Sequence, residues 1–184
     1  MTRREFDGVT IECTQGDIAA QSDLDAVVNA ANAELRTGGG VAGALHRAAG
    51  PGLEEECRPL APITPGQAVI TGAHRLPNRY VVHCLGPVHG VDEPAEQLLA
   101  NCYREALQLA DGHGVASIGF PSISTGAFGY PVEAAAQTAM DAVAGALSGL
   151  GRIRLVRFVL FGRGDFQVYA GALERLPANG SVSP

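Results

Sequence analysis

The sequence predicts an α/β protein, with helices on both faces of one mixed β-sheet. Short apolar runs typical of strands alternate along the chain with longer stretches of helical periodicity. Several of the runs are continuously apolar rather than alternating, as expected for strands that are covered on both faces. The length of 184 residues fits one domain better than two.

Strands are expected where β-branched and other apolar residues cluster between turn signals. In chain order, these runs are Val9–Gln15, Ala26–Ala31, Ala68–Thr71, Tyr80–Leu85, Val115–Pro121 and Ile153–Phe161.

Helices are expected between these strands. Apolar residues repeat at spacings of three and four over Leu98–Ala110 and Val132–Leu147. Two further helices are expected at Val41–Ala49 and Asp165–Leu176, the second with its acidic residue at the start. The segment Arg58–Gln67 contains three prolines and is expected to form a loop. We expect one domain over residues 1–176 and a flexible C-terminal tail over 177–184.

Composition excludes several classes of protein. The net charge is −6, and no basic cluster is longer than a pair, so a nucleic-acid groove is not expected. All 13 basic residues are arginines, which removes Schiff-base and Walker-type chemistry through lysine. No apolar run reaches 18 residues and no secretory signal leads the chain, so we expect no membrane partner. Four cysteines without a CxxC pair indicate reduced thiols and a cytoplasmic location. We also expect no metal centre and no cofactor.

Two glycine-rich loops each follow a predicted strand and precede a predicted helix. The first is Gly38–Gly40, and the second is Ser122–Gly129. Glycines let a ligand approach the backbone, and a helix N-terminus attracts anions, so the pair together predicts a phosphate site made of backbone amides. Either loop alone is also compatible with a simple tight turn. Neither loop matches the ordinary dinucleotide or P-loop pattern.

Other polar and aromatic residues lie beside these loops. Asn32 ends an Asn-Ala-Ala-Asn segment and has the donors and acceptor needed to bind sugar hydroxyls or a water. Asp17 could accept a hydrogen bond from an exocyclic amine, or could simply cap a turn. Phe161 and Phe166 could stack on a base, although each taken singly is more typical of a core residue.

Alternative chemistries have weaker support. His83, Cys84 and His89 are close in sequence but lack a fourth zinc ligand. Ser124 lacks the Gly-x-Ser-x-Gly elbow of a hydrolase nucleophile, and the five histidines are scattered.

From about Val9 to Leu176, the chain resembles the macrodomains, a family of ADP-ribose-binding modules. Several ordered segments carry the resemblance, and they are Gln15–Ile18, Val27–Asn32, Gly38–Val41, His46–Pro51, Arg75–Pro77, Val82–Pro87 and Ser124–Pro131. The segments His46–Pro51 and Arg75–Pro77 are most similar to the MacroD-type branch. The resemblance implies a three-layer α/β/α fold around a mixed sheet of six or seven strands.

The resemblance also implies a role for each matching residue. Asp17 and the Ile18 amide would hold adenine, with Phe161 packed against it. The second loop would wrap the diphosphate through Ser124, Thr125, Gly126, Ala127 and Phe128. Asn32, Gly39, Gly40 and Val41 would line the distal ribose and diphosphate, with Asn32 and Gly40 in catalytic roles.

One position departs from the MacroD-type pattern. These hydrolases carry an aspartate ten residues after the second Asn of the Asn-Ala-Ala-Asn segment, where this chain has Ala42. The Ala42 loop is similar to that of viral macrodomains, which lack this aspartate and still remove ADP-ribose from proteins. Those domains often place His before the glycines, where this chain has Thr37.

Two functions follow from the resemblance. The leading interpretation is a monomeric hydrolase that removes mono-ADP-ribose from acidic residues of modified proteins and also acts on O-acetyl-ADP-ribose. A water held by Asn32 would attack, with a phosphate of the ligand as base. The alternative is a reader that binds ADP-ribose without chemistry, because Ala42 supplies no general base. Erasers of nucleic-acid-linked ADP-ribose depend on a lysine that this chain lacks.

Overall fold

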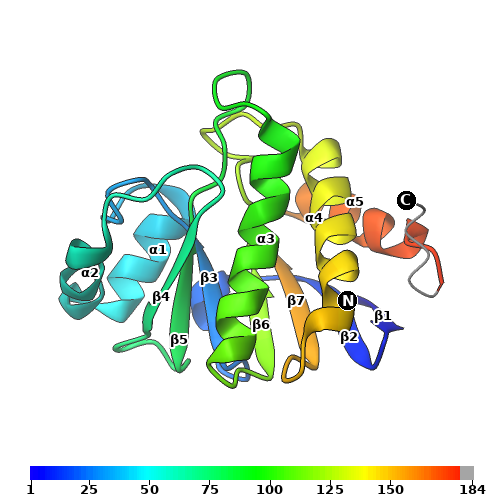
Figure 1. Cartoon of the computed structure of the whole chain (residues 1–184), viewed down its shortest axis with the longest axis horizontal. Helices are drawn as coiled ribbons and strands as arrows, with labels where there is room; N and C mark the ends of the chain where they lie inside the picture. The colour runs from blue at the N-terminus through cyan, green and yellow to red at the C-terminus, as the bar shows by residue number, and fades with distance from the viewer. Residues whose placement is uncertain (179–184) are drawn as a thin grey trace.

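Seven strands form one mixed sheet in the computed structural model, which describes residues 1–178 (Figure 1). The order across the sheet is β1-β2-β7-β6-β3-β5-β4. The five central strands run parallel, and the outer strands β1 and β4 pair antiparallel with β2 and β5. The strands are β1 Thr2–Phe6, β2 Val9–Gln15, β3 Ala26–Ala30, β4 Ala68–Gly72, β5 Tyr80–Cys84, β6 Ser117–Phe120 and β7 Leu155–Leu160.

Helices cover both faces of the sheet and complete an α/β/α sandwich (Figure 1). The α-helices are α1 Gly40–Ala49, α2 Pro51–Cys57, α3 Ala95–Gly112, α4 Val132–Ala146 and α5 Arg163–Arg175. Short 3₁₀ turns lie at Ile18–Ala20, Arg58–Leu60 and Leu147–Gly149. One apolar cluster packs α3, α4 and α5 against the sheet, and a smaller cluster packs α1 and α2 on the opposite face. The predicted fold class is therefore confirmed.

Neither β1 nor α2 was predicted from the sequence. β1 forms a hairpin with β2 in which Phe6 pairs with Val9, and the connecting Asp7-Gly8 turn has φ angles of 49° and 78°. Asp-Gly is a strong signal for this type of hairpin turn, so the sequence did contain the information. α2 begins with Pro51 directly after Gly50, whose φ is 80°, because a proline is well tolerated in the first helical turn.

Two strands begin later than predicted, because an apolar residue can be buried without pairing with a neighbouring strand. Val115 and Ile153 are fully buried, yet both precede their strands. The Asp111 carboxylate accepts hydrogen bonds from the backbone N–H groups of Gly151, Arg152 and Ile153, in place of a neighbouring strand.

The C-terminal end of the chain is only partly described. α5 ends at Arg175, and the expected tail lies outside the described residues from position 179 onwards. In the described part of the chain, no helix is both long and apolar enough to cross a membrane.

Candidate functional site

A cleft of about 710 Å³ lies where all five parallel strands end. The lining residues include Ala30, which ends β3, and Gly16 and Pro121, which follow β2 and β6. Gly86 and Phe161 follow β5 and β7. Because the carboxyl ends of parallel strands meet at one edge of a sheet, segments far apart in sequence form one site. All of the residues predicted to bind a ligand line this cleft, namely Asp17, Ile18, Asn32, Gly39, Gly40, Val41, Ser124, Thr125, Gly126, Ala127, Phe128 and Phe161.

The first glycine loop leads directly into α1. Gly40 is the first residue of the helix and has a φ of 54°, which L-residues rarely adopt, so glycine is required by the backbone. A Cβ on Gly43 would overlap the Gly38 carbonyl oxygen, so the loop can fold against the first helical turn only with glycine there. The loop therefore presents backbone amides and the positive end of α1 to the cleft.

The second glycine loop follows β6 and curls back on itself. The Tyr130 N–H donates to the Ser124 carbonyl at 2.9 Å, and the Gly129 N–H donates to the Gly126 carbonyl at 3.0 Å. Ser124 has a φ of 67°, a conformation that is strained for a serine and typical of functional loops. Its hydroxyl is buried and finds no hydrogen-bond partner among residues 1–178.

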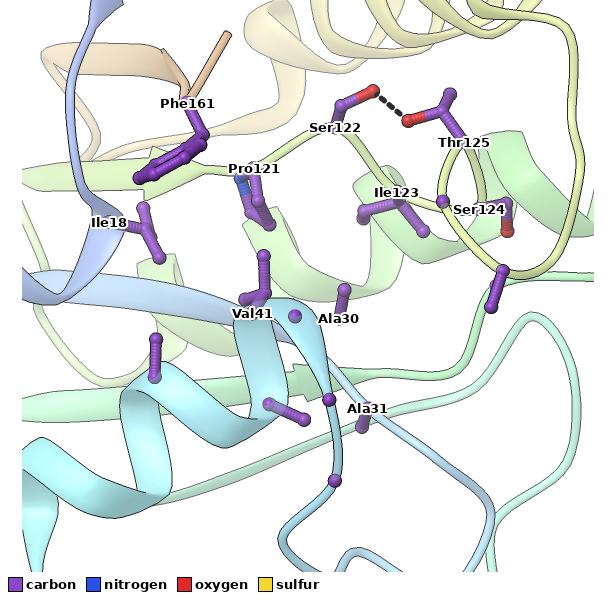
Figure 2. A pocket seen from close by; sticks show the side chains of 18 of the residues that line it. Ile18, Ala30, Ala31, Val41, Pro121, Ser122, Ile123, Ser124, Thr125 and Phe161 are labelled. Carbon is purple, nitrogen blue, oxygen red and sulfur yellow. Dashed lines mark hydrogen bonds between the residues drawn. The ribbon is translucent and has the colours of Figure 1, made fainter.

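Contacts from two other elements support the second loop. The Ser122 hydroxyl lies 2.6 Å from the Thr125 hydroxyl (Figure 2). It also lies 2.9 Å from the hydroxyl of Tyr169 on α5. A Cβ on Gly86, after β5, would collide with the Ser124 hydroxyl, so glycine allows the two segments to approach closely. The loop is thus held in place before any ligand binds, which lowers the entropic cost of binding.

One end of the cleft has an aromatic wall beside a carboxylate. Phe161 lies next to Ile18 at this end, and 85% of its surface is exposed (Figure 2). The expectation that Phe161, taken singly, is a core residue was therefore wrong, whereas Phe166 does pack against the core. Asp17 caps the turn at Ile18–Ala20, because its Oδ1 accepts from the Ala19 N–H at 2.8 Å.

Asn32 and Ala42 lie around the first glycine loop. The Asn32 side chain bonds the backbone of Arg36 twice, with Nδ2 donating to the carbonyl and Oδ1 accepting from the N–H, both at 2.9 Å. An amide has one further hydrogen and one further lone pair, so Asn32 can still bind a ligand while it shapes its own loop. A Cβ on Gly38 would lie 3.4 Å from Asn32 Nδ2 and 4.0 Å from the Ala42 Cβ, so the three residues are neighbours.

Few charged side chains line the cleft. Among residues 1–178, the charged residues that line the cleft are Asp17, Arg47 and Asp165. With one cation against two carboxylates, an anionic ligand in this cleft would depend mainly on backbone amides. This arrangement agrees with a chain that has no lysine.

His83 belongs to a buried polar cluster below the cleft. Its Nδ1 lies 3.1 Å from Asn29 Nδ2, and its Nε2 lies 3.0 Å from the Thr71 hydroxyl. Burial, with a smaller contribution from His46, lowers the pKa of His83 from 6.5 to about 3. Within residues 1–178, no group of three or more His, Cys, Asp or Glu side chains could hold a metal ion.

Some lining residues were not predicted as site residues. Arg47 reaches back along α1 to the first glycine loop, since a Cβ on Gly43 would lie 2.9 Å from its Nη1. Asp165 and Gly86 also line the cleft. Gly86 had a detectable signal, because it follows a predicted strand and precedes a proline, and Arg47 lies in the His46–Pro51 segment that resembles the MacroD-type branch. Nothing local distinguishes Asp165 from other surface charges.

Comparison with known proteins identifies the family. The family model "Macro domain" matches residues 28–139. A macro domain-containing protein of Chlorobaculum tepidum is 48% identical over 168 residues, which cover 91% of this chain and 97% of that protein. A Cronobacter sakazakii protein named O-acetyl-ADP-ribose deacetylase is 46% identical over 164 residues, covering 86% of this chain and 91% of that protein. The chain belongs to the macro domain family.

Solved structures agree with this assignment. The Oceanobacillus iheyensis macrodomain with ADP superposes with a TM-score of 0.89 at 38% identity, covering 94% of each chain. The Trypanosoma brucei macrodomain in complex with ADP-ribose superposes with a TM-score of 0.81 at 37% identity, covering 89% of this chain and 68% of that one.

Proposed function

We propose that the cleft binds ADP-ribose. The observation that carries this proposal is the meeting of two backbone-amide loops with an exposed aromatic ring and a carboxylate in one cleft at the ends of the parallel strands. Such a cleft offers a separate surface to each part of a nucleoside diphosphate sugar. The relatives named for ADP-ribose chemistry and the related structures with ADP and ADP-ribose support it.

The proposed orientation follows the order of surfaces along the cleft. Adenine packs on Phe161 and Ile18, and its amine donates to Asp17. The diphosphate lies against the second loop, from Ser124 to Phe128, and against the amides of the first loop and the start of α1. The distal ribose lies by Asn32 and Gly38–Val41, with Phe128 at its border.

We further propose hydrolysis of mono-ADP-ribose from acidic residues of modified proteins, and of O-acetyl-ADP-ribose. On the modified protein, a water held by Asn32 and by backbone groups at Gly40 forms a bond to the anomeric carbon. The bond from that carbon to the carboxylate oxygen breaks, and the carboxylate leaves with the electron pair. The water's proton passes to a phosphate oxygen of the ligand, because Ala42 supplies no base. A carboxylate is a good leaving group, so orientation of the water makes the main contribution.

The alternative is an ADP-ribose reader, which Ala42 motivates. The hydrolase is favoured because relatives of similar length are named as enzymes, including O-acetyl-ADP-ribose deacetylases of Cronobacter sakazakii and Klebsiella pneumoniae. A Xenopus laevis relative, 45% identical over 170 residues that cover 40% of its length, is named an ADP-ribose glycohydrolase. We propose a monomeric domain over residues 1–176 that works without a metal or cofactor. We also propose that it works in the cytoplasm, in line with its four free, buried cysteines.

One assay separates the enzyme from the reader. Purified protein is incubated with a glutamate-ADP-ribosylated protein, and both the released ADP-ribose and the remaining label are measured, beside the variant Asn32→Ala. Release that falls in the variant supports a hydrolase without the usual aspartate. No release, together with calorimetric binding of free ADP-ribose, identifies a reader. Absence of both release and binding would contradict the whole proposal.

A further inference from the structure

A chain of hydrogen bonds behind the cleft ties β7 to the segment that contains Asp17. It begins at Arg157 on β7, whose Nε donates to Glu12 Oε1 on β2 at 2.6 Å. Its Nη1 and Nη2 donate to the two carboxylate oxygens of Asp23 at 2.9 and 2.8 Å. Glu12 is buried and the Arg157 side chain is only 14% exposed, so this ion pair is shielded from much of the solvent, whereas the Asp23 side chain is 64% exposed.

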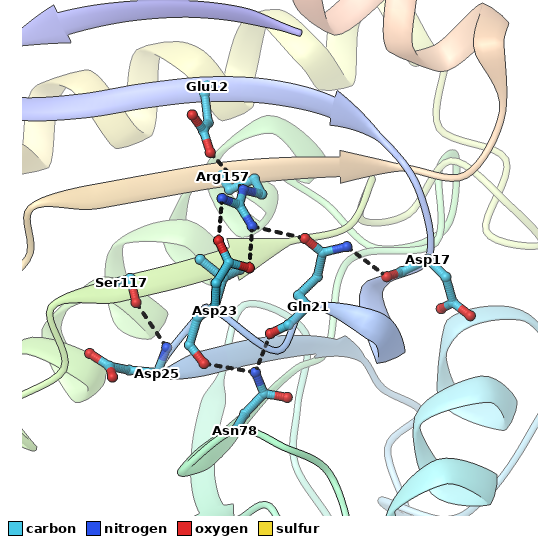
Figure 3. Close-up of polar contacts among 9 residues, drawn as sticks. Glu12, Asp17, Gln21, Asp23, Asp25, Asn78, Ser117 and Arg157 are labelled. Atoms are coloured by element: carbon cyan, nitrogen blue, oxygen red, sulfur yellow. Dashed lines mark hydrogen bonds and ion pairs between the residues drawn. The ribbon is translucent and has the colours of Figure 1, made fainter.

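The same guanidinium orients a neutral amide. Arg157 Nη1 donates to Gln21 Oε1 at 3.0 Å, and Gln21 Nε2 donates to the Asp17 carbonyl oxygen at 2.9 Å (Figure 3). A guanidinium can only donate hydrogen bonds, so it selects the oxygen of the Gln21 amide and turns the NH₂ group towards Asp17. The Gln21 backbone is held separately, because Asn78 Nδ2 donates to its carbonyl at 2.7 Å.

Asp17 is therefore held from several sides. Its carbonyl accepts hydrogen bonds from Gln21 Nε2 at 2.9 Å and from the Ala20 N–H at 3.1 Å, and its Oδ1 accepts from the Ala19 N–H. The preceding residue, Gly16, donates its N–H to the Leu160 carbonyl at 2.9 Å. These contacts leave the second carboxylate oxygen available to the cleft, and they fix the direction in which it points.

We propose that Gln21, oriented by Arg157, is a positioning residue that makes the cleft selective for a 6-aminopurine over a 6-oxopurine. This inference rests on the proposed binding of ADP-ribose with adenine at Asp17. A carboxylate held at a fixed angle accepts a hydrogen bond from the amine of adenine, but it repels the carbonyl oxygen of hypoxanthine. A carboxylate free to turn away would lose both the attraction and the repulsion.

The test compares ADP-ribose with inosine diphosphate ribose by calorimetry on the full chain. We expect the wild type to prefer ADP-ribose by roughly 10- to 100-fold. Gln21→Glu keeps an oxygen for Arg157 but replaces the donor to Asp17 with an acceptor. The preference for ADP-ribose over inosine diphosphate ribose should fall by about 3- to 10-fold, and only the affinity for ADP-ribose should decrease. In an Asp17→Ala background the same substitution should have no further effect.

Two controls isolate the positioning effect. Gln137→Glu makes the same chemical change on the exposed face of α4, where the amide contacts Asp141, and should leave both affinities unchanged. Gln21→Met removes both hydrogen bonds without adding charge, and replaces Gln21→Glu if thermal unfolding shows that Gln21→Glu does not fold.

The outcomes separate this inference from the proposed function. An unchanged ligand preference in both Gln21 variants, or an equal loss for both ligands, would overturn the positioning role. A wild type that binds ADP-ribose without preferring it would also overturn the inference, while the proposed function would stand. A wild type that binds neither ligand would overturn both.

Discussion

A negative charge at Gly126 is the most direct test of the proposed diphosphate site. Gly126 is exposed at the tip of the second loop, and a Cβ added there meets no heavy atom within 4 Å. Its φ lies outside the left-handed region, so a side chain costs the backbone little. The substitution Gly126→Glu should therefore leave the fold intact and act on the ligand alone.

The expected effect follows from Coulomb's law. Two unit charges ~5 Å apart repel by about 3 kcal/mol at an effective dielectric constant of about 20. Solvent at this exposed position screens part of the repulsion, but both phosphates of the ligand contribute. We expect a loss of roughly 3 kcal/mol, or more than 100-fold in Kd for ADP-ribose.

Calorimetry with ADP-ribose measures this effect, and Gly126→Gln is the matched control. The neutral variant has almost the same size and should change Kd by less than about threefold, because the space at position 126 is open. Raising the salt concentration should reduce the loss of ADP-ribose affinity in the Glu variant, but it should not alter the small change in the Gln variant. Wild-type affinity in Gly126→Glu would show that the second loop does not hold the diphosphate.

Three further predictions concern single side chains. Asn32→Ala should lower turnover by roughly 10²-fold or more with a modest loss of affinity, because Asn32 orients the water. Single-turnover kinetics measures the first effect and calorimetry the second, and unchanged turnover would exclude this role. Asp17→Ala should weaken ADP-ribose by about 1–3 kcal/mol in calorimetry, and equal affinity would place adenine elsewhere. Between pH 6.5 and about 3, unfolding should let His83 bind a proton that the folded protein excludes. The free energy of unfolding should thus fall by about 2 kcal/mol from pH 6.5 to 5. In urea titrations, the free energy of unfolding of His83→Gln should depend less on pH than that of the wild type. An equal pH dependence in both proteins would assign the titration to another group.

Much of the fold could be predicted from local sequence. The strand Val9–Gln15 was predicted to the residue, and the helix at Val132 ends within one residue of its predicted end, because apolar periodicity and flanking turn residues are local signals. The cleft loops could also be predicted, because two glycine loops that each follow a strand and precede a helix together favour an anion site, although either loop alone is compatible with a tight turn. β1 was missed because a charged edge strand lacks the apolar run of a central strand, although the Asp7-Gly8 turn marks the hairpin.

By itself, the sequence determined the α/β class, the glycine loops and the absence of lysine, all of which depend on residue identity and short spacing. Only the tertiary structure decided which residues meet. It exposed Phe161 at the cleft and connected Gln21 to Arg157, which lies 136 positions further along the chain. Such contacts depend on the order of strands across the sheet. That order is set by long-range pairing, and no local pattern in the sequence encodes it.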